Sequence, residues 1–127
     1  MPGTAAKLRH LLKRTEFLRA ARGNRAGRSA FLLQAIESGG DGPGIGYTVT
    51  KKTGNSPERS RIKRRLREAA RACQSGFKPR HDYVLVGRRE ALSVPFSQLV
   101  ADINSAVAKV HSTKIHASRA QGPRDDA

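Results

Sequence analysis

A strand, a polar turn and a strongly basic helix follow one another over residues 46–71, and this segment constrains the fold more than any other. Residues 46–50 are rich in β-branched and aromatic side chains, which predicts a strand. Residues 53–55 have the composition of a tight turn. We expect Ser56 to cap the helix that follows, with Pro57 at its first position, where a missing N–H costs nothing.

This basic helix, which should close near residue 75, divides into an apolar stripe and a cationic remainder. The predicted buried stripe, at helical spacing, consists of Ile62, Leu66, Ala69 and Cys73. The remaining circumference carries Arg59, Arg61, Lys63, Arg64, Arg65, Arg67 and Arg71. Like charges at this spacing repel one another and cost stability, and an ordinary solvated face mixes both signs. The pattern therefore favours a face that binds a polyanion, for which arginine is the better phosphate fork.

The composition of the whole chain agrees with that interpretation. The chain has 127 residues and a formal net charge of +15, which predicts one domain that binds nucleic acid or an anionic surface. We expect a flexible arm over 1–7, a folded domain over 8–110 and a disordered tail over 111–127. The absence of long apolar runs predicts no membrane association and no signal peptide. A single cysteine fits a reducing cytoplasm.

The first predicted helix lies within residues 8–22 and is also basic. Thr15 can cap it, and Gly23 can end it in the left-handed conformation. Residues 23–27 are expected to form a basic loop. Phe17 fits two roles: a core side chain, or a stacking platform for an unpaired base, since cations flank it.

The remaining apolar segments predict three strands and a last helix. Residues 29–37 form the first strand, 38–44 a turn, and 45–50 the antiparallel return strand. Alternation places Ala30, Leu32 and Gln34 on one face of the first strand, and Phe31, Leu33 and Ala35 on the other. The apolar run 82–87 predicts a central strand, joined to 45–50 by a parallel crossover.

The last helix starts at residues 93–95. Its apolar stripe is Phe96, Leu99, Val100, Ile103, Ala106, Val107 and Val110. The predicted fold is a single-domain α+β sandwich in the order α-β-β-α-β-α, with room for a short extra strand in the first hairpin.

No arrangement of residues in the sequence predicts catalysis by the protein itself. The acidic residues are scattered, with no D-x-D or E-x-x-H spacing, and the four histidines are isolated from one another. No phosphate-binding glycine motif is present. We therefore expect no metal site and no bound cofactor, and a binding protein whose chemistry lies in a partner.

The basic segment resembles the motif of the bacterial ribonuclease P protein family, which typically reads KK-x-GN-A-V-x-RNR-x-KR-x-x-RE. The matching residues are Lys51, Lys52, Gly54, Asn55, Arg59, Arg61, Lys63, Arg64, Arg67 and Glu68. Two departures occur: Ser60 replaces the central Asn, and Ser56-Pro57 replace the Ala-Val. Residues 12–17, which read Leu-Lys-Arg-Thr-Glu-Phe, are also similar to the family's Leu-Lys-Arg-x-x-x-Phe opening, although Ala21 stands where the family often has a second aromatic residue.

The resemblance implies a fold like the second domain of the ribosomal small-subunit protein S-five, with a left-handed crossover. It implies a non-catalytic protein subunit of an endoribonuclease that removes the 5′ leader of precursor tRNA. The partner RNA subunit, with magnesium, would perform the hydrolysis. The partners would be this RNA and precursor tRNA, and the protein would be monomeric outside the holoenzyme.

The resemblance also implies two sets of binding residues. The catalytic RNA would contact Lys51, Lys52, Asn55, Arg59, Ser60, Arg61, Lys63, Arg64, Arg65 and Arg67. The leader would contact Lys13, Arg14, Phe17 and Phe31.

Two alternatives remain open at this point. One is a ribosome-associated, general RNA-binding or DNA-binding protein, although a uniformly cationic helix argues against readout of base edges. The other is a protein-only nuclease whose acidic residues meet in the fold.

Overall fold

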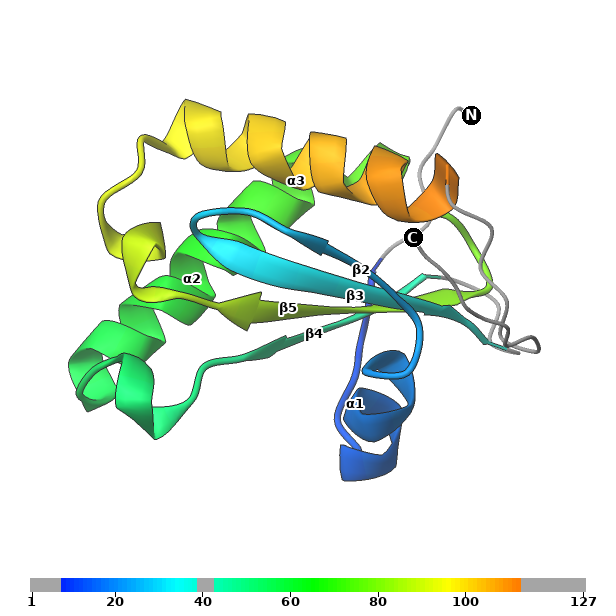
Figure 1. Ribbon diagram of the computed structural model, residues 1–127, viewed down its shortest axis with the longest axis horizontal. Helices are drawn as coiled ribbons and strands as arrows, with labels where there is room; N and C mark the ends of the chain where they lie inside the picture. The colour runs from blue at the N-terminus through cyan, green and yellow to red at the C-terminus, as the bar shows by residue number, and fades with distance from the viewer. Residues whose placement is uncertain (1–7, 39–42, 113–127) are drawn as a thin grey trace.

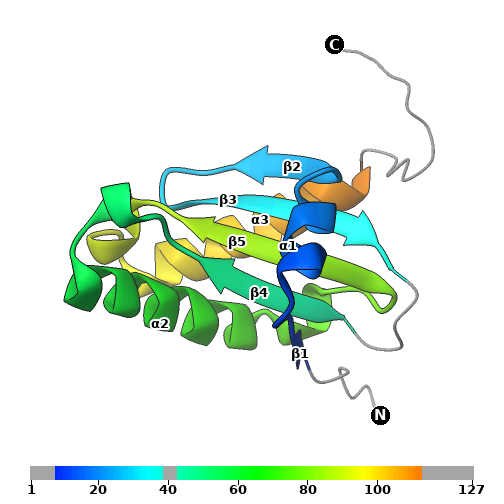
Figure 2. The same ribbon diagram turned by 90° about the horizontal axis from the view of Figure 1, so that it is seen from below.

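A five-stranded sheet with helices on both faces forms the part of the chain that the computed structural model describes, residues 8–38 and 43–112 (Figure 1). The strands are β1 (Arg9–His10), β2 (Asn24–Gly27), β3 (Phe31–Glu37), β4 (Gly44–Thr48) and β5 (His81–Gly87). The helices are α1 (Arg14–Ala20), α2 (Ser56–Ala72) and α3 (Phe96–Ser112), with short 3₁₀ turns at Lys51–Thr53, Gln74–Gly76 and Arg89–Leu92. The view from below shows α1 in front of the sheet and α2 and α3 behind it (Figure 2). No helix within the described ranges is long and apolar enough to cross a membrane.

The strand order is β1-β4-β5-β3-β2, so β5 is the central strand, as predicted. β4 runs parallel to β5, which confirms the crossover through α2. The prediction that residues 45–50 pair with the first strand is wrong, because β5 lies between β3 and β4. The hairpin partner of β3 is instead β2, which was predicted to be a loop. Asn24, Arg25 and Gly27 have weak strand propensity, but pairing with β3 and burial of Ala26 outweigh it.

The predicted stripe on α2 is confirmed: Ile62, Leu66, Ala69 and Cys73 are all buried. The predicted cap is wrong by one residue. Asn55, not Ser56, caps α2, and its side-chain oxygen accepts from the Glu58 N–H at 2.9 Å. The Glu58 carboxylate accepts in turn from the Asn55 N–H at 2.9 Å. This reciprocal arrangement satisfies two helix-end donors, which a single Ser56 hydroxyl would not do.

Helix α1 lies within the predicted range 8–22, but neither of its predicted ends is correct. It starts after Lys13, and the Glu16 carboxylate rather than Thr15 accepts from the free N–H groups of Leu12 and Lys13. These two bonds lower the pKa of Glu16. At the other end, Ala21 is right-handed, and no described glycine has a positive φ.

The sheet separates two hydrophobic clusters. The larger cluster joins the odd-numbered side chains of β3 to α2 and α3, and the smaller cluster joins Leu11, Ala20, Ile36 and Val84 under α1. On α3, the buried residues are Leu99, Ile103, Ala106, Val107 and Val110. Phe96, at the start of the predicted stripe, is 42% exposed. Helix α3 continues to Ser112, past the predicted domain end at residue 110. The predicted arm (1–7), most of the turn at 38–44 and nearly all of the tail lie outside the described residues.

A polar cluster fixes the end of α3 to the start of β5. Tyr83 is fully buried, and burial raises its pKa to about 12. Its hydroxyl accepts from the Lys78 N–H at 2.9 Å and lies 2.6 Å from His111 Nε2, to which it donates when the imidazole is neutral. Burial first, and then the neighbouring His81 and Lys78, lower the pKa of His111 to about 4.

This lowered pKa predicts an acid-sensitive contact. The folded-state pKa of His111 lies below its ordinary value of 6.5, so the unfolded chain binds the proton more readily. The contribution of neutral His111 to the free energy of unfolding should be complete above about pH 6.5. It should fall by about 2 kcal/mol as the pH approaches 4, a value already reduced because His111 is partly exposed to solvent. Urea unfolding at both ends of this range, for the parent protein and for His111→Gln, measures it. Equal pH dependence of the two proteins would contradict the assignment.

Candidate nucleic-acid interface

The cations of α2 divide into those that are free to meet a partner and those that are bonded within the protein. Arg61 and Arg64 are exposed, and across residues 8–38 and 43–112 neither makes a hydrogen bond or an ion pair. Lys63 lies between them and is half-buried, and Ser60 is exposed one position before Arg61. Lys51 and Lys52 are exposed in the 3₁₀ turn that precedes the helix. The exposed cations among them therefore lie on the N-terminal half of α2 and on the turn before it.

Three other arginines of α2 are held by the protein itself. Arg59 donates to the Gly54 carbonyl at 2.8 Å, and Arg65 donates to the Ala91 carbonyl at 2.6 Å. Arg67 lies over the ring of Tyr47, 5.4 Å from its centroid. These contacts orient the guanidinium groups and still leave N–H donors for a phosphate. The predicted RNA-binding cations therefore include some that are bonded within the protein and some that have no bonding partner among the described residues.

The start of α2 is also tied to the connection between β5 and α3. Arg89 donates to the Glu58 carboxylate at 2.8 and 3.1 Å and to the Thr53 carbonyl at 3.1 Å. The bond from Arg89, followed by the bond from the Asn55 N–H, lowers the pKa of Glu58 to about 2. Glu58 is therefore fully ionised at neutral pH and offsets positive charge at the helix start. Because Asn55 uses its side-chain oxygen as the cap, only its amide N–H₂ is available to an RNA partner.

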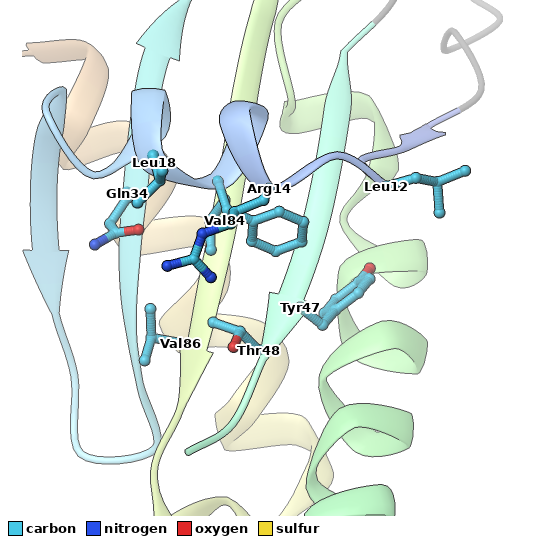
Figure 3. Close-up of a pocket in the computed structure, with 9 residues that line it drawn as sticks. Leu12, Arg14, Leu18, Gln34, Tyr47, Thr48, Val84 and Val86 are labelled. Atoms are coloured by element: carbon cyan, nitrogen blue, oxygen red, sulfur yellow. The ribbon is translucent and has the colours of Figure 1, made fainter.

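A second candidate surface is the cleft between α1 and the sheet, with a volume of about 470 Å³ (Figure 3). Its lining residues are Leu12, Arg14, Phe17, Leu18, Gln34, Tyr47, Thr48, Val84 and Val86. Leu12 and Leu18 are large apolar residues left 84% and 53% exposed. Arg14 supplies positive charge, and none of the described residues that line the cleft carries a carboxylate. Apolar walls with one cation suit unpaired bases joined by phosphates.

Phe17 forms a wall of this cleft and also belongs to the edge of the core. A methyl group built on Gly46 would come within 2.6 Å of the Phe17 ring, so the ring lies directly against the backbone of β4. Phe17 is half-buried and packs beside Leu11, Ala20, Ile36 and Val84. One part of the ring therefore supports α1, and another part faces the cleft.

A buried ion pair holds α1 in position. Asp82 on β5 is 1% exposed, and the Arg9 guanidinium donates to it at 2.8 Å. Arg9 also lies 3.5 Å from the Glu16 carboxylate at the start of α1. This chain of contacts connects the central strand to β1 and the first turn of α1. The position of α1 beside the sheet is therefore supported by the pairing of Arg9 with Asp82.

Of the four residues predicted to meet the leader, the structure places two in the cleft, Arg14 and Phe17. Lys13 is exposed at the N-cap of α1 and does not line the cleft. Phe31 is wrong as a cleft residue, because it is fully buried on the face of β3 that α2 and α3 cover. The predicted alternation on β3 already placed Phe31 opposite Gln34, which does line the cleft. Tyr47 and Thr48 of β4 also line the cleft, which was not predicted from the sequence. Their polar groups within a predicted strand were a usable signal.

The described residues contain no group of three or more His, Cys, Asp or Glu side chains that could hold a metal ion. Cys73 is buried, and its thiol lies 3.4 Å from the Val100 carbonyl. Burial raises the pKa of this thiol, as expected for a core cysteine.

Solved structures of known proteins share this arrangement. The ribonuclease P protein of Staphylococcus aureus superposes with a TM-score of 0.68 at 25% identity, covering 82% of this chain and 98% of that one. The ribonuclease P protein from Thermotoga maritima superposes with a TM-score of 0.66 at 21% identity, covering 85% and 99%. The sheet, the three helices and their order thus define the α+β fold of bacterial ribonuclease P proteins.

Sequence comparison gives the family directly. A family model described as Ribonuclease P matches residues 5–111. The ribonuclease P protein component of Ruegeria pomeroyi is 44% identical over 109 residues, covering 82% of this chain and 87% of that protein. The corresponding protein of Brucella suis is 42% identical over 108 residues, covering 76% of each. The chain belongs to the ribonuclease P protein family, whose members are components of a tRNA-processing endoribonuclease.

Proposed function

We propose that this protein holds the single-stranded 5′ leader of precursor tRNA in the cleft between α1 and the sheet, and binds the ribonuclease P RNA through α2. The observation that carries the proposal is the cleft itself, whose walls combine the Phe17 ring, apolar strand residues and Arg14 without any carboxylate. Such a surface accepts unpaired bases with little sequence preference, which suits an enzyme acting on many precursors.

The positive surface of α2 has a different role in this proposal. Arg61, Arg64 and the neighbouring lysines meet the phosphates of the catalytic RNA, and the bonded arginines fix the orientation of the helix. Phosphate contacts of this kind supply affinity and register rather than sequence readout. The RNA, with magnesium, carries out the hydrolysis of the phosphodiester bond, and the protein positions the substrate.

Phe17→Ala tests the leader cleft. We expect about tenfold weaker binding of a precursor with a leader of several nucleotides, because a stacked base is worth about 1–3 kcal/mol. Mature tRNA, which has no leader, should bind almost unchanged. The measurement is the Kd of each RNA for holoenzyme assembled from the variant. Because Phe17 is only half-buried, the variant should lose less unfolding free energy than the roughly 3–5 kcal/mol lost when a fully buried phenylalanine is replaced by alanine.

Phe96→Ala is the matched control, since it removes an exposed phenylalanine from α3, outside the cleft. It should leave the affinity for both RNAs unchanged. Omitting the ribonuclease P RNA should abolish cleavage by either protein, whereas cleavage by RNA-free protein would favour the protein-only nuclease. A large fall in the melting temperature of Phe17→Ala, with both RNAs affected alike, would remove Phe17 from the binding surface.

A further inference from the structure

A second hollow, of about 330 Å³, lies between the β1–β4 edge of the sheet and the C-terminal half of α2. Its lining residues are Leu8, His10, Ile45, Tyr47, Arg67, Arg71 and Gln74. We call it the Tyr47–Arg67 hollow. Its volume is within the lower range of small-ligand sites, roughly 300–1,000 Å³. Like the cleft, it contains positive charge and an aromatic ring, and its lining within the described part of the chain includes no carboxylate.

The charge in this hollow is not satisfied within the protein. The Nε atom of Arg67 is buried and has no hydrogen-bond partner among the described residues. A buried donor without a partner is costly, so the Arg67 guanidinium has hydrogen-bonding capacity that the described residues do not use. Arg71 adds a second guanidinium, which is exposed. Both cations lie close enough to Tyr47 to act on its hydroxyl, although burial dominates and raises the pKa of Tyr47 to about 12.

Tyr47 connects the two sites. It lines both the cleft and the Tyr47–Arg67 hollow, and its ring extends from β4 toward α2 (Figure 3). β1 pairs only with Gly44 and Ile45, so no described strand covers the edge of β4 at Tyr47 and Thr48. An extended chain in the cleft can therefore pass over this open edge from the α1 face of the sheet to the α2 face.

We propose that the Tyr47–Arg67 hollow binds one unpaired nucleotide of the leader beyond those held in the cleft. The phosphate pairs with Arg67 and Arg71, and the base lies against Tyr47. This inference rests on the proposed function, since the leader must first occupy the cleft. The same chemistry would accept an unpaired nucleotide of the ribonuclease P RNA, so the experiment must distinguish the two sources.

Arg71→Gln removes one charge from the hollow and leaves a shorter, uncharged side chain that can still donate a hydrogen bond. Arg64→Gln is the matched control, because it removes the same charge from an exposed position of α2 that does not line the hollow. Precursor affinity is measured for holoenzymes carrying each protein, with leaders from zero to about ten nucleotides, a length comparable with known single-strand sites. Assembly with the ribonuclease P RNA is measured separately.

We expect Arg71→Gln to bind short-leader precursors as the parent protein does, and to lose about three- to tenfold in affinity once the leader extends past the cleft. Arg64→Gln should instead weaken assembly with the ribonuclease P RNA, and its assembled holoenzyme should bind precursors of every leader length as the parent does. If Arg71→Gln weakens assembly with the ribonuclease P RNA and shows no leader-dependent loss, the nucleotide belongs to the RNA subunit and the leader route is overturned. If the parent protein shows leader dependence but Arg71→Gln matches it throughout, the hollow is not a site. A parent protein without leader dependence would overturn the proposed function itself.

Discussion

Binding of the protein to the ribonuclease P RNA should weaken by about three orders of magnitude when monovalent salt rises from about 50 to about 200 mM. Counterion release predicts this if about five to seven phosphates are neutralised, which gives a log–log slope near −4 to −6. The free Arg61 and Arg64 of α2, with Lys51 and Lys52, provide four of these contacts. The half-buried Lys63 and the bonded Arg59 and Arg65, which retain N–H donors, bring the number to seven. Filter binding or fluorescence anisotropy across a salt series gives the slope.

A double variant locates the charges responsible. Arg61→Ala with Arg64→Ala should reduce the magnitude of the slope by about 1.5, because each lost phosphate contact contributes about 0.7–0.9. Arg22→Ala with Arg25→Ala removes the same charge from exposed positions outside α2, and should leave the slope almost unchanged. Equal losses from the two double variants, or a parent slope near zero, would show that α2 is not the main RNA-binding surface.

Gly23→Ala should cost about 3 kcal/mol or more of unfolding free energy, at the upper end for added groups in a packed site. A methyl group at Gly23 would lie 1.9 Å from the Ala35 carbonyl oxygen and 2.7 Å from its carbon. That carbonyl belongs to β3, which is paired on both sides, so it cannot move away without breaking the sheet. The required glycine thus reflects close backbone approach rather than the left-handed conformation predicted from the sequence. Urea unfolding measures the loss.

Gly76→Ala is the control for this prediction. The nearest atom to a methyl group there is Asn104 Oδ1 at 3.7 Å, an ordinary contact. Its stability should change by less than about 0.5 kcal/mol, as for most surface substitutions. Similar urea midpoints for the two variants would mean that the segment between α1 and β2 can move away from β3 at little cost.

Periodic elements and the parallel crossover through α2 could be predicted from the sequence, and the order of the strands in the sheet could not. The stripe on α2 follows a helical period, so Ile62 and Leu66 were placed correctly. The strand β2 has too little propensity to be seen without its partner, because only Ala26 is buried. The insertion of β5 between β3 and β4 depends on how the α2 crossover returns, which no local pattern records.

The candidate site divides in the same way. The cations of α2 lie on one continuous helix, so their position outside its apolar stripe could be predicted from the helical period. The cleft is built from α1, β3, β4 and β5, so its lining required the strand order. Phe31 shows the consequence: an aromatic residue near Arg28 looks suitable for stacking, but its position in the pleat directs it into the core.

The length of α1 links leader binding to local folding. A helix of seven residues is well below the roughly 12–15 residues at which isolated helices become marginal in water. Its order therefore depends on Phe17 against Gly46 and on Arg9 with Asp82. Opening the cleft and melting α1 are then one sub-global event, with a free energy below that of global unfolding. A nucleic-acid strand that fills the cleft would protect the amides of α1 from hydrogen exchange, and part of its binding energy would be used to order the helix that contacts it.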